Sequence, residues 1–555
     1  MIPKLPKILL YLLIALFVLN MAQSYFTELI FDEAYYWYYA QNMAWGYFDH
    51  PPMVALMIKL SSFFFNGELG VRFMSCIFSV ATFLVLWQLI DNPKKERYGA
   101  HFFVLVFSMT LINAYGFFTL PDTPFLFFTA LFLLLYKKFI AKPSALLSLG
   151  LGLVMAALMY SKYHAVLVIL FTLLSNLKLV KNKYAWLAVV VALVCYTPHF
   201  LWLYENDYIS IKYHLYERPN RAYEFGDFTL GYFINLVALF GLTFPWIYKS
   251  LFKTKAKDQF TKAMLYLTYG VLIFFFVSSF NRRVQTQWII VISIPMAIMA
   301  FNYLLENDSA KKWIYRMGIA NIAILLLLRI GLVYEPLFPI VYESHGNTKW
   351  VGDIKSQIGD MPVVFENSYR SAPMYAFYSG SPTYSLNNIM YRQNQYSIDD
   401  SESKVQHQKI LYVSKYTKSG DITLNWPDGT VFYGNYIENF ESFRKLRCYV
   451  AEKNIKLGDG EELTLKVFNP YQTNIPLEKL KFGVAYLNDY KQVMETLPLQ
   501  VVSKNMETLF IKAQDSTVFT FKLPKPKMED PGFFKISISE NGLYMGINGD
   551  NIKLD

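Results

Sequence analysis

Hydrophobic and polar positions divide the chain into two parts of different texture. From the start to about residue 335, apolar runs of roughly 20 residues recur, which is the length that an α-helix needs to cross a bilayer. After about residue 350 the pattern changes to short apolar segments separated by turns and polar stretches. The pattern predicts a polytopic α-helical membrane protein that continues into an extracytoplasmic region.

About eleven apolar segments are expected to form transmembrane helices, and we expect the first to be retained rather than cleaved. They are residues 8–24, 71–90, 99–117, 122–140, 144–161, 163–179, 184–203, 229–248, 262–280, 286–304 and 313–334. Alternate loops are rich in Lys and Arg, and they all fall on the side of the N-terminus, which the positive-inside rule assigns to the cytoplasm. With an odd number of spans, the C-terminal region emerges on the outer side.

The C-terminal region predicts two kinds of structure. Segments 361–365 and 409–413 are typical of buried strands, and Ser368 to Tyr378 predicts a short helix ended by Gly380, so this part reads as a small α/β unit. From about residue 440, alternating segments parted by turns indicate a β-sandwich, with strands expected at 463–468, 482–486, 518–521 and 534–538.

Three domains follow from these patterns. We expect a transmembrane domain at residues 1–335, a small α/β extracytoplasmic domain at 336–437 and a β-sandwich-like extracytoplasmic domain at 438–555. Composition agrees with the membrane assignment, because 54% of the 555 residues are hydrophobic and only 17% are charged, against about a quarter in a soluble protein. The net charge of +10 lies in the alternate basic loops, so it indicates membrane topology and no nucleic-acid partner.

Unusual carboxylates cluster on the predicted outer side. Asp32 and Glu33 follow the first span, Asp49 stands beside His50 in the next loop, and Asp122 opens another span. Ionised groups at a membrane are costly unless they serve a substrate or each other. Simpler interpretations remain open: acidic residues in a first helical turn can merely cap it, for about 0.3–1 kcal/mol, and His50 can be an ordinary interfacial histidine.

Cationic residues lie on the same outer side, against the positive-inside bias. His50, Lys162, Arg282 and Arg283 are the candidates, and Arg and Lys beside carboxylates suit a phosphate group. Such a site fits a lipid-linked phosphosugar, whose phosphate leaves without needing a proton, while one carboxylate acts as general base on an acceptor hydroxyl in an inverting displacement.

In this hypothesis, the catalytic carboxylates share the work. Asp32 orients or deprotonates the acceptor, Glu33 supports Asp32, and Asp122 positions the acceptor or an ion. The substrate-lining residues are expected to be Tyr36, Trp37, Tyr47 and Asp49. Asp32, Asp49 and Asp122 would suit a divalent cation, Mg²⁺ or Mn²⁺, if they converge, but the sequence leaves the metal undetermined.

Several motifs together resemble the bacterial glycosyltransferases of the GT-C class that are related to protein O-mannosyltransferases and to the aminoarabinose transferases of lipid A. These motifs lie at 31–36, 46–53, 68–72, 121–124, 161–167, 285–288, 368–372, 376–378 and 391–396, so the resemblance covers roughly residues 25–400. One departure is His50, where the aminoarabinose transferases carry a lysine.

The resemblance implies transfer of a sugar from a polyprenyl-phosphate donor to a lipid, glycan or protein acceptor of the cell envelope, on the periplasmic face of a bacterial inner membrane. It places the first-loop acidic residue of the class at Asp32 and the second outer-loop acidic residue at Asp122. A transporter or flippase of lipid-linked sugars is the main alternative, although the inverted repeats typical of transporters are not evident. A nonenzymatic anchored envelope protein would need far fewer spans than these.

Overall fold

The structure is a computed structural model, and it describes residues 5–338, 340–452, 455, 457, 461–503 and 509–554. The chain forms two compact units. We call the first the membrane unit; it comprises Met1–Asp207 and Tyr223–His345. The second, here the extramembranous unit, comprises Tyr208–Ala222 and Gly346–Asp555, so a segment between two helices of the membrane unit belongs to it.

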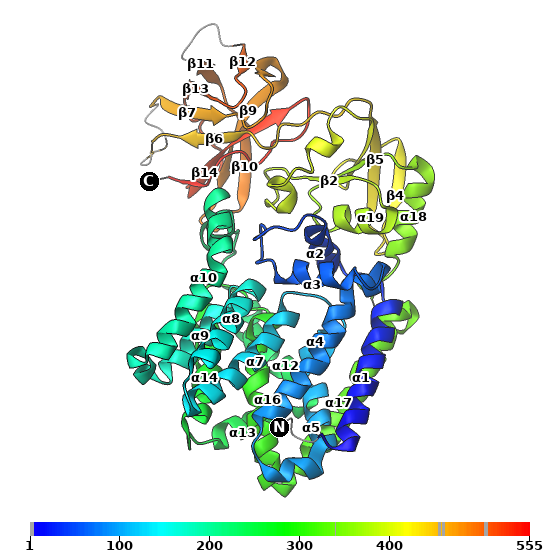
Figure 1. Cartoon of the computed structure of the whole chain (residues 1–555). Coiled ribbons are helices and arrows are strands. Elements are labelled where there is room, and N and C mark those ends of the chain that lie inside the picture. Colours follow the sequence, from blue (N-terminus) through cyan, green and yellow to red (C-terminus); the bar gives the residue numbers. More distant parts are fainter. Residues whose placement is uncertain are drawn as a thin grey trace. The chain divides into compact units, whose positions relative to one another are not determined.

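The membrane unit consists of helices (Figure 1). In chain order they are α1 (Lys7–Phe26), α2 (Phe31–Gln41), α3 (Met53–Ser61), α4 (Gly67–Leu89), α5 (Gly99–Phe107), α6 (Thr110–Ala114), α7 (Asp122–Ala141), α8 (Ala145–Ser161), α9 (Ala165–Leu174), α10 (Lys183–Glu205), α12 (Gly231–Phe240), α13 (Phe244–Lys253), α14 (Gln259–Ser278), α15 (Thr286–Ile289), α16 (Ser293–Glu306) and α17 (Asp308–Val333). Within the described residues, eight helical stretches are long and apolar enough to cross a membrane. They make the protein a multi-pass membrane protein.

Two of the predicted spans differ from the expectation. The prediction at 144–161 agrees with α8, whereas the segment 163–179 forms only the 10-residue helix α9. The single span predicted at 99–117 is wrong, because the chain breaks between α5 and α6. Side-chain amides bind the carbonyls freed at this break: Asn321 donates to Ser108 O at 2.6 Å and Asn113 donates to Phe107 O at 3.1 Å. A break in a membrane helix is tolerated where such groups replace the lost bonds.

A five-stranded mixed sheet forms the first part of the extramembranous unit. Its strands are β1 (Val363–Glu366), β2 (Thr383–Leu386), β3 (Ile410–Ser414), β4 (Ile422–Asn425) and β5 (Val431–Ile437), in the order β2-β1-β3-β5-β4. β1 pairs in parallel with β2 and β3, and β5 is antiparallel to both of its neighbours. Two helices accompany this sheet, α18 (Asn347–Ile358) and α19 (Ser371–Ser379). As predicted, α19 ends at Gly380, which adopts the left-handed conformation.

Two four-stranded antiparallel sheets form the remaining part. One has the order β10-β9-β14-β15 and the other β11-β13-β7-β6. Their bounds are β6 (Arg447–Val450), β7 (Leu463–Phe468), β9 (Leu480–Leu487), β10 (Val493–Pro498), β11 (Val501–Ser503), β13 (Ser516–Phe521), β14 (Phe533–Glu540) and β15 (Ile552–Lys553), with a separate pair β8 (Ile475–Pro476) and β12 (Phe510–Ile511). Buried side chains of both sheets, such as Leu465 and Val484, share one hydrophobic core, which is the arrangement of a sandwich.

The segment Tyr208–Ala222, which includes α11 (Ile209–Lys212), is bound to both parts of the extramembranous unit. Arg392 donates to the hydroxyl of Tyr213 at 2.9 Å, and the backbone N–H of Asn220 donates to Tyr490 O at 2.9 Å. Glu217 faces the buried Lys535: burial lowers the pKa of the lysine, and the negative charges of Glu217 and Asp550 oppose that shift. No local pattern in the sequence predicts this association.

Candidate active site in the membrane unit

The acidic pair at the start of α2 occupies two different environments. Asp32 is half-buried, whereas Glu33 is completely buried. Arg72 on α4 binds Glu33 with two parallel bonds, Nε to Oε1 at 2.8 Å and Nη2 to Oε2 at 2.5 Å. The backbone N–H groups of Thr119 and Ile30 also donate to this carboxylate, at 2.8 and 3.3 Å. These four bonds fill the acceptor capacity of a carboxylate, so Glu33 is held firmly in place.

Arg72 itself is fully buried and uses its remaining donors on the end of α1. Nη1 donates to the carbonyls of Ser24 and Thr27, at 3.1 and 2.5 Å, and Nη2 donates to Glu28 O at 3.0 Å. The bidentate fork of a guanidinium suits this combination of a carboxylate and carbonyls. Arg72 and Glu33 therefore join α1, α2, α4 and the segment before α7, and they fix the backbone from which Asp32 projects.

A second buried pair links α7 to the end of α8. Lys162, directly after α8, places Nζ 2.6 Å from Oδ1 of Asp122, the first residue of α7. Both side chains are nearly buried, with exposed fractions of 7% and 6%. Nζ also donates to Gln287 O at 3.3 Å, which brings the start of α15 to the same place. The predicted acid at the outer end of α7 and the predicted cation after α8 are thus in direct contact.

Two tyrosines lie near the acidic residues. Tyr115 lies within electrostatic range of both Asp122 and Asp32, and Tyr342 lies within electrostatic range of Asp32 and Glu33. Thr119, bound to Glu33, lies only three residues before Asp122. The structure therefore brings Asp32 and Asp122, which are 90 positions apart in the sequence, into the same region of the membrane unit.

The loop after α2 folds back on the aromatic face of that helix. The rings of Tyr47 and Tyr39 are stacked with centroids 4.2 Å apart, and the Tyr47 hydroxyl donates to Tyr39 O at 3.0 Å. The ring of His50 packs edge-on against that of Tyr36, with centroids 5.5 Å apart. Tyr36 lies one helical turn after Asp32 on α2. Asp49 is buried, with 7% of its surface exposed. His50, Tyr36 and Tyr47 thus belong to one cluster with α2, on which Trp37 is half-buried.

Arg282 and Arg283 lie in the turn between α14 and α15, where Arg282 is half-buried and Arg283 is exposed. The backbone N–H of Arg282 donates to Ser278 O at 2.8 Å. Gln287, the partner of Lys162, follows a few residues later, so this turn is close in sequence to the Asp122–Lys162 pair. The predicted role of the two arginines stays a prediction.

Comparison with known proteins points to one class. A family model described as dolichyl-phosphate-mannose-protein mannosyltransferase matches residues 49–202. The lipid A galacturonosyltransferase RgtD of Rhizobium johnstonii is 26% identical over 196 residues, which are 34% of this chain and 41% of that relative. Crystal structures of ArnT from Cupriavidus metallidurans superpose with TM-scores of 0.54 in the apo state and 0.55 bound to undecaprenyl phosphate, at 14% and 13% identity, covering 73% of this chain and 92% of ArnT. The chain has the GT-C glycosyltransferase fold.

This result confirms the fold class and the resemblance predicted from the sequence. The region that matches the family model contains Asp49, His50, Asp122 and Lys162, whereas Asp32 and Glu33 precede it. The chain aligns with less than half of the length of the galacturonosyltransferase, so that match covers one part of the GT-C fold.

Sequence reasoning missed two polar groups that shape this GT-C unit. Arg72 belongs to the motif at 68–72, but no local pattern predicts that it binds Glu33, 39 positions earlier. Arg329, buried in α17, donates to the side chains of Asn113 and Asn20 at 2.8 and 2.9 Å. A lone arginine inside an apolar span is the signal that would have pointed to such a partner, because buried membrane charges are paired.

Metal ligands are not gathered in the part of the chain that the structure describes. No three His, Cys, Asp or Glu side chains there are arranged to hold a metal ion. Asp122, one of the three predicted ligands, has a lysine ammonium 2.6 Å from its Oδ1.

Proposed function

We propose that this protein is an inverting glycosyltransferase that moves a sugar from a polyprenyl-phosphate donor to a cell-envelope acceptor. The observation that carries the proposal is a hydrogen bond within a GT-C membrane unit: Thr119, three residues before the Asp122–Lys162 pair, donates to Glu33, the sequence neighbour of Asp32. Two comparisons support the substrate class: the related ArnT was crystallised with undecaprenyl phosphate, and the related RgtD is named for lipid A.

Asp32 is the proposed general base. It is half-buried and belongs to the first turn of α2, whose position is fixed through Glu33 and Arg72. Its carboxylate takes the proton of the acceptor hydroxyl as the acceptor oxygen bonds to the anomeric carbon, and the bond from that carbon to the phosphate oxygen breaks. The polyprenyl phosphate leaves with the bonding electrons, and the configuration inverts. Glu33 acts as a positioning residue, because its four hydrogen bonds leave it no lone pair for a substrate.

Lys162 is the proposed partner of the leaving phosphate. An ammonium group has three N–H donors, and Asp122 and Gln287 O occupy two of them. The third donor is available to a phosphate oxygen, and the adjacent Asp122 holds the ammonium in position. A preorganised cation near the leaving oxygen stabilises the charge that develops there. Asp122 in this arrangement orients Lys162 and, through it, the donor.

His50, Arg282 and Arg283 are proposed to hold further phosphate oxygens, and Tyr36, Trp37, Tyr47 and Asp49 to line the approach of the substrates. The packing of His50 against Tyr36 supports this for the first loop, since Tyr36 lies one turn after Asp32 on α2. We further propose the bacterial inner membrane as the location, with the N-terminus in the cytoplasm and the extramembranous unit in the periplasm. The basic loops on the side of the N-terminus support this orientation.

Reconstitution tests the proposal. The full chain in proteoliposomes receives radiolabelled undecaprenyl-phosphate sugars with either lipid A or a Ser/Thr-containing peptide as acceptor. Asp32→Asn is expected to lower the transfer rate by roughly 10²–10⁴-fold, the usual contribution of a general base, while donor binding is kept. Asp122→Asn is expected to lower transfer and to weaken donor binding, because Lys162 loses its orienting partner.

The matched control is Asp308→Asn. Asp308 also opens a long helix, α17, but its side chain is 94% exposed and pairs with Lys311 on the surface. It should transfer sugar at the wild-type rate. Wild-type turnover in both Asp32→Asn and Asp122→Asn would remove the assignment. The alternative, a flippase, would move a labelled lipid-linked sugar across the bilayer without forming a new glycosidic bond.

A further inference from the structure

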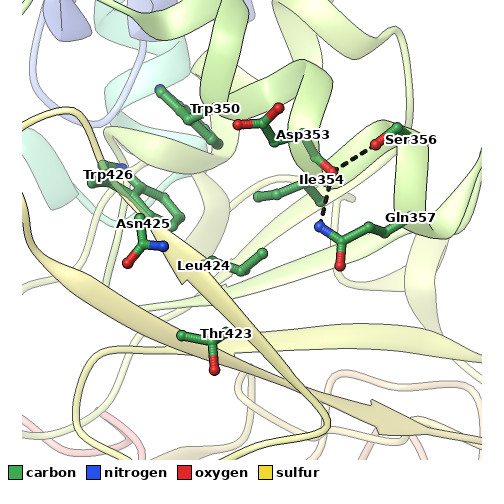
Figure 2. A pocket seen from close by; sticks show the side chains of 9 residues that line it. All are labelled: Trp350, Asp353, Ile354, Ser356, Gln357, Thr423, Leu424, Asn425 and Trp426. Atoms are coloured by element: carbon green, nitrogen blue, oxygen red, sulfur yellow. Dashed lines mark hydrogen bonds between the residues drawn. The ribbon is translucent and has the colours of Figure 1, made fainter.

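A cavity of about 290 Å³ lies in the extramembranous unit, between α18 and the edge strand β4 of the mixed sheet (Figure 2). The helix contributes Trp350, Asp353, Ile354, Ser356 and Gln357, and the strand and the residue after it contribute Thr423, Leu424, Asn425 and Trp426. This volume is near the lower end of ligand pockets, which span roughly 300–1,000 Å³, so it suits a small ligand.

The lining follows the periodicity of both elements, yet it is unusually polar for that position. Trp350, Asp353, Ile354 and Gln357 are spaced as one helical face, i, i+3, i+4 and i+7. Such a face normally carries apolar residues toward a sheet. Here Trp350 and Ile354 are buried, whereas Asp353 and Gln357 are exposed in the cavity. Packing explains the first two residues and leaves the polar ones unexplained.

Aromatic rings form the apolar side of the cavity. Trp350 and Trp426 are stacked with centroids 4.7 Å apart, and Trp426 stacks in turn on Phe432 at 3.9 Å. The indole N–H of Trp350 donates to Asn347 Oδ1 at 3.0 Å, so this ring presents only apolar surface elsewhere. Both tryptophans also belong to the core of the domain, and the cavity meets them at its edge.

Hydrogen-bonding groups of both kinds surround the rest of the cavity. Ser356 Oγ and Gln357 Nε2 donate to the backbone carbonyl of Asp353, at 2.9 and 3.0 Å, as Figure 2 shows. These bonds fix the two side chains and leave their oxygens to accept. The Asp353 carboxylate adds acceptors, and Thr423 and Asn425 add donors and acceptors.

Charge narrows the class of ligand. None of the residues that line the cavity is Lys, Arg or His, and one of them, Asp353, is acidic. A phosphate or a sugar acid would meet a carboxylate without any compensating cation. A neutral polyol finds amide, hydroxyl and carboxylate groups for its hydroxyls, and the rims of the buried Trp350 and Trp426 form the apolar wall beside them.

We propose that this cavity is a binding site for a neutral saccharide, separate from the transfer chemistry of the membrane unit. Its donors and acceptors match the hydroxyls of one sugar ring, and the rims of the two tryptophans form its apolar wall. The ligand is either the neutral part of an envelope glycan or a free sugar, which share this chemistry.

The test is a titration of the full chain in nanodiscs, followed by saturation-transfer NMR. The probes are the methyl glycosides of glucose, galactose and mannose, and methyl galacturonoside is the acidic comparator. We expect saturable binding of at least one neutral glycoside and binding of the galacturonoside at least about tenfold weaker, because Asp353 repels it. An oligosaccharide released from lipopolysaccharide that binds more tightly than the monosaccharides assigns the site to an envelope glycan; equal affinity assigns it to a free sugar.

Variants place the binding in this cavity. Asp353→Ala and Asn425→Ala change exposed side chains and are each expected to weaken binding at least about tenfold, with the thermal unfolding temperature unchanged. Asp428→Ala is the matched control, because Asp428 is an exposed aspartate on the turn beside Trp426 and does not line the cavity. Binding that survives both cavity variants, no saturable binding of any neutral glycoside, or equal affinity for the galacturonoside would overturn the proposal. The measurement needs no sugar transfer, so Asp32→Asn is expected to bind the glycosides as the wild type does.

Discussion

Two buried acid–base pairs in the membrane unit differ in how fully their groups are used. Around Glu33, four N–H donors bind one carboxylate, and the remaining N–H groups of Arg72 donate to backbone carbonyls. Around Asp122, one oxygen meets one ammonium, and Lys162 makes a single further bond. Both pairs are almost excluded from solvent.

The difference separates structure from chemistry. In a saturated pair, every donor and acceptor is already occupied, so the pair cannot bind a substrate. Its role is to hold together the helices and segments that it joins. In an unsaturated pair, the two charges neutralise each other while one N–H donor can still bind a substrate. A group held in place in this way is a preorganised binding group. From this comparison we interpret Glu33–Arg72 as a pair that stabilises the fold, and we propose that Asp122–Lys162 belongs to the active site.

The largest expected effect comes from breaking the saturated pair. Arg72→Met should destabilise the membrane unit by roughly 3–5 kcal/mol, because Glu33 would remain charged, buried and without its partner. Thermal unfolding of the detergent-solubilised chain measures this loss. Arg72→Lys should rescue little of it, since an ammonium cannot reproduce the bidentate fork or reach the carbonyls at the end of α1.

The double variant Glu33→Gln with Arg72→Met is the control for this interpretation. It removes both charges, so we expect it to unfold at a temperature between those of Arg72→Met and the wild type. An Arg72→Met single variant as stable as the wild type would contradict the role of the Glu33–Arg72 pair in stabilising the fold.

Breaking the unsaturated pair should affect activity more than stability. Lys162→Met is expected to lower sugar transfer by roughly 10²–10³-fold, the range seen when one preorganised stabilising donor is removed. Its unfolding temperature should fall less than that of Arg72→Met, because Asp122 sits at the N-terminus of α7, where the helix dipole favours a negative charge. Adding Asp122→Asn should restore stability without restoring transfer. A larger loss of stability than in Arg72→Met would reverse the comparison.

Much of this architecture was predictable from the sequence, because it rests on local periodicity. The strand predicted at 463–468 agrees with β7, and the segments at 361–365, 409–413 and 534–538 lie within or next to β1, β3 and β14. Gly380 ends α19 as predicted, since a left-handed residue favours glycine. Apolar length likewise located the eight helical stretches that, in the part of the chain described by the structure, are long and apolar enough to cross a membrane.

The parts that were not predictable depend on partners far away in the sequence. The break between α5 and α6 is stabilised by Asn321 on α17, more than 200 positions later. The partner of Glu33 is 39 positions away, and the apolar pattern of a helix does not indicate which residue its arginine binds. The segment 208–222 reads as a loop between spans, yet it belongs to the extramembranous unit through contacts such as Arg392 with Tyr213. Its placement is decided by tertiary packing alone.

A third buried pair, in the extramembranous unit, sharpens the comparison. Arg444 Nε lies 3.2 Å from Glu540 Oε1, and both side chains are buried. The backbone N–H of Phe443 is a further donor to this carboxylate, at 3.2 Å. These contacts are fewer and longer than those around Glu33, and the acidic Glu402 lies nearby. Burial therefore outweighs the attraction of Arg444 and raises the pKa of Glu540 to about 7.

The smallest expected effect is the pH dependence that follows. A carboxyl whose pKa rises on folding is stabilising while it is protonated, so its contribution is present below its ordinary pKa of 4.5 and is lost as the pH rises through about 7. Calorimetry of the intact chain should show a lower unfolding temperature for the extramembranous unit at pH 7.5 than at pH 5, with a loss of at most about 3 kcal/mol at 1.36 kcal/mol per pKa unit.

Glu540→Gln should reduce this slope of stability against pH without abolishing it, because burial also raises the pKa of Glu402. The exposed Asp360, whose pKa Lys355 lowers, acts only at more acidic pH, so Asp360→Asn is the matched control and should leave the slope unchanged. If Glu540→Gln and the wild type lose stability equally between pH 5 and 7.5, Glu540 is ionised throughout, and the Arg444 pair is as strong as the one at Glu33.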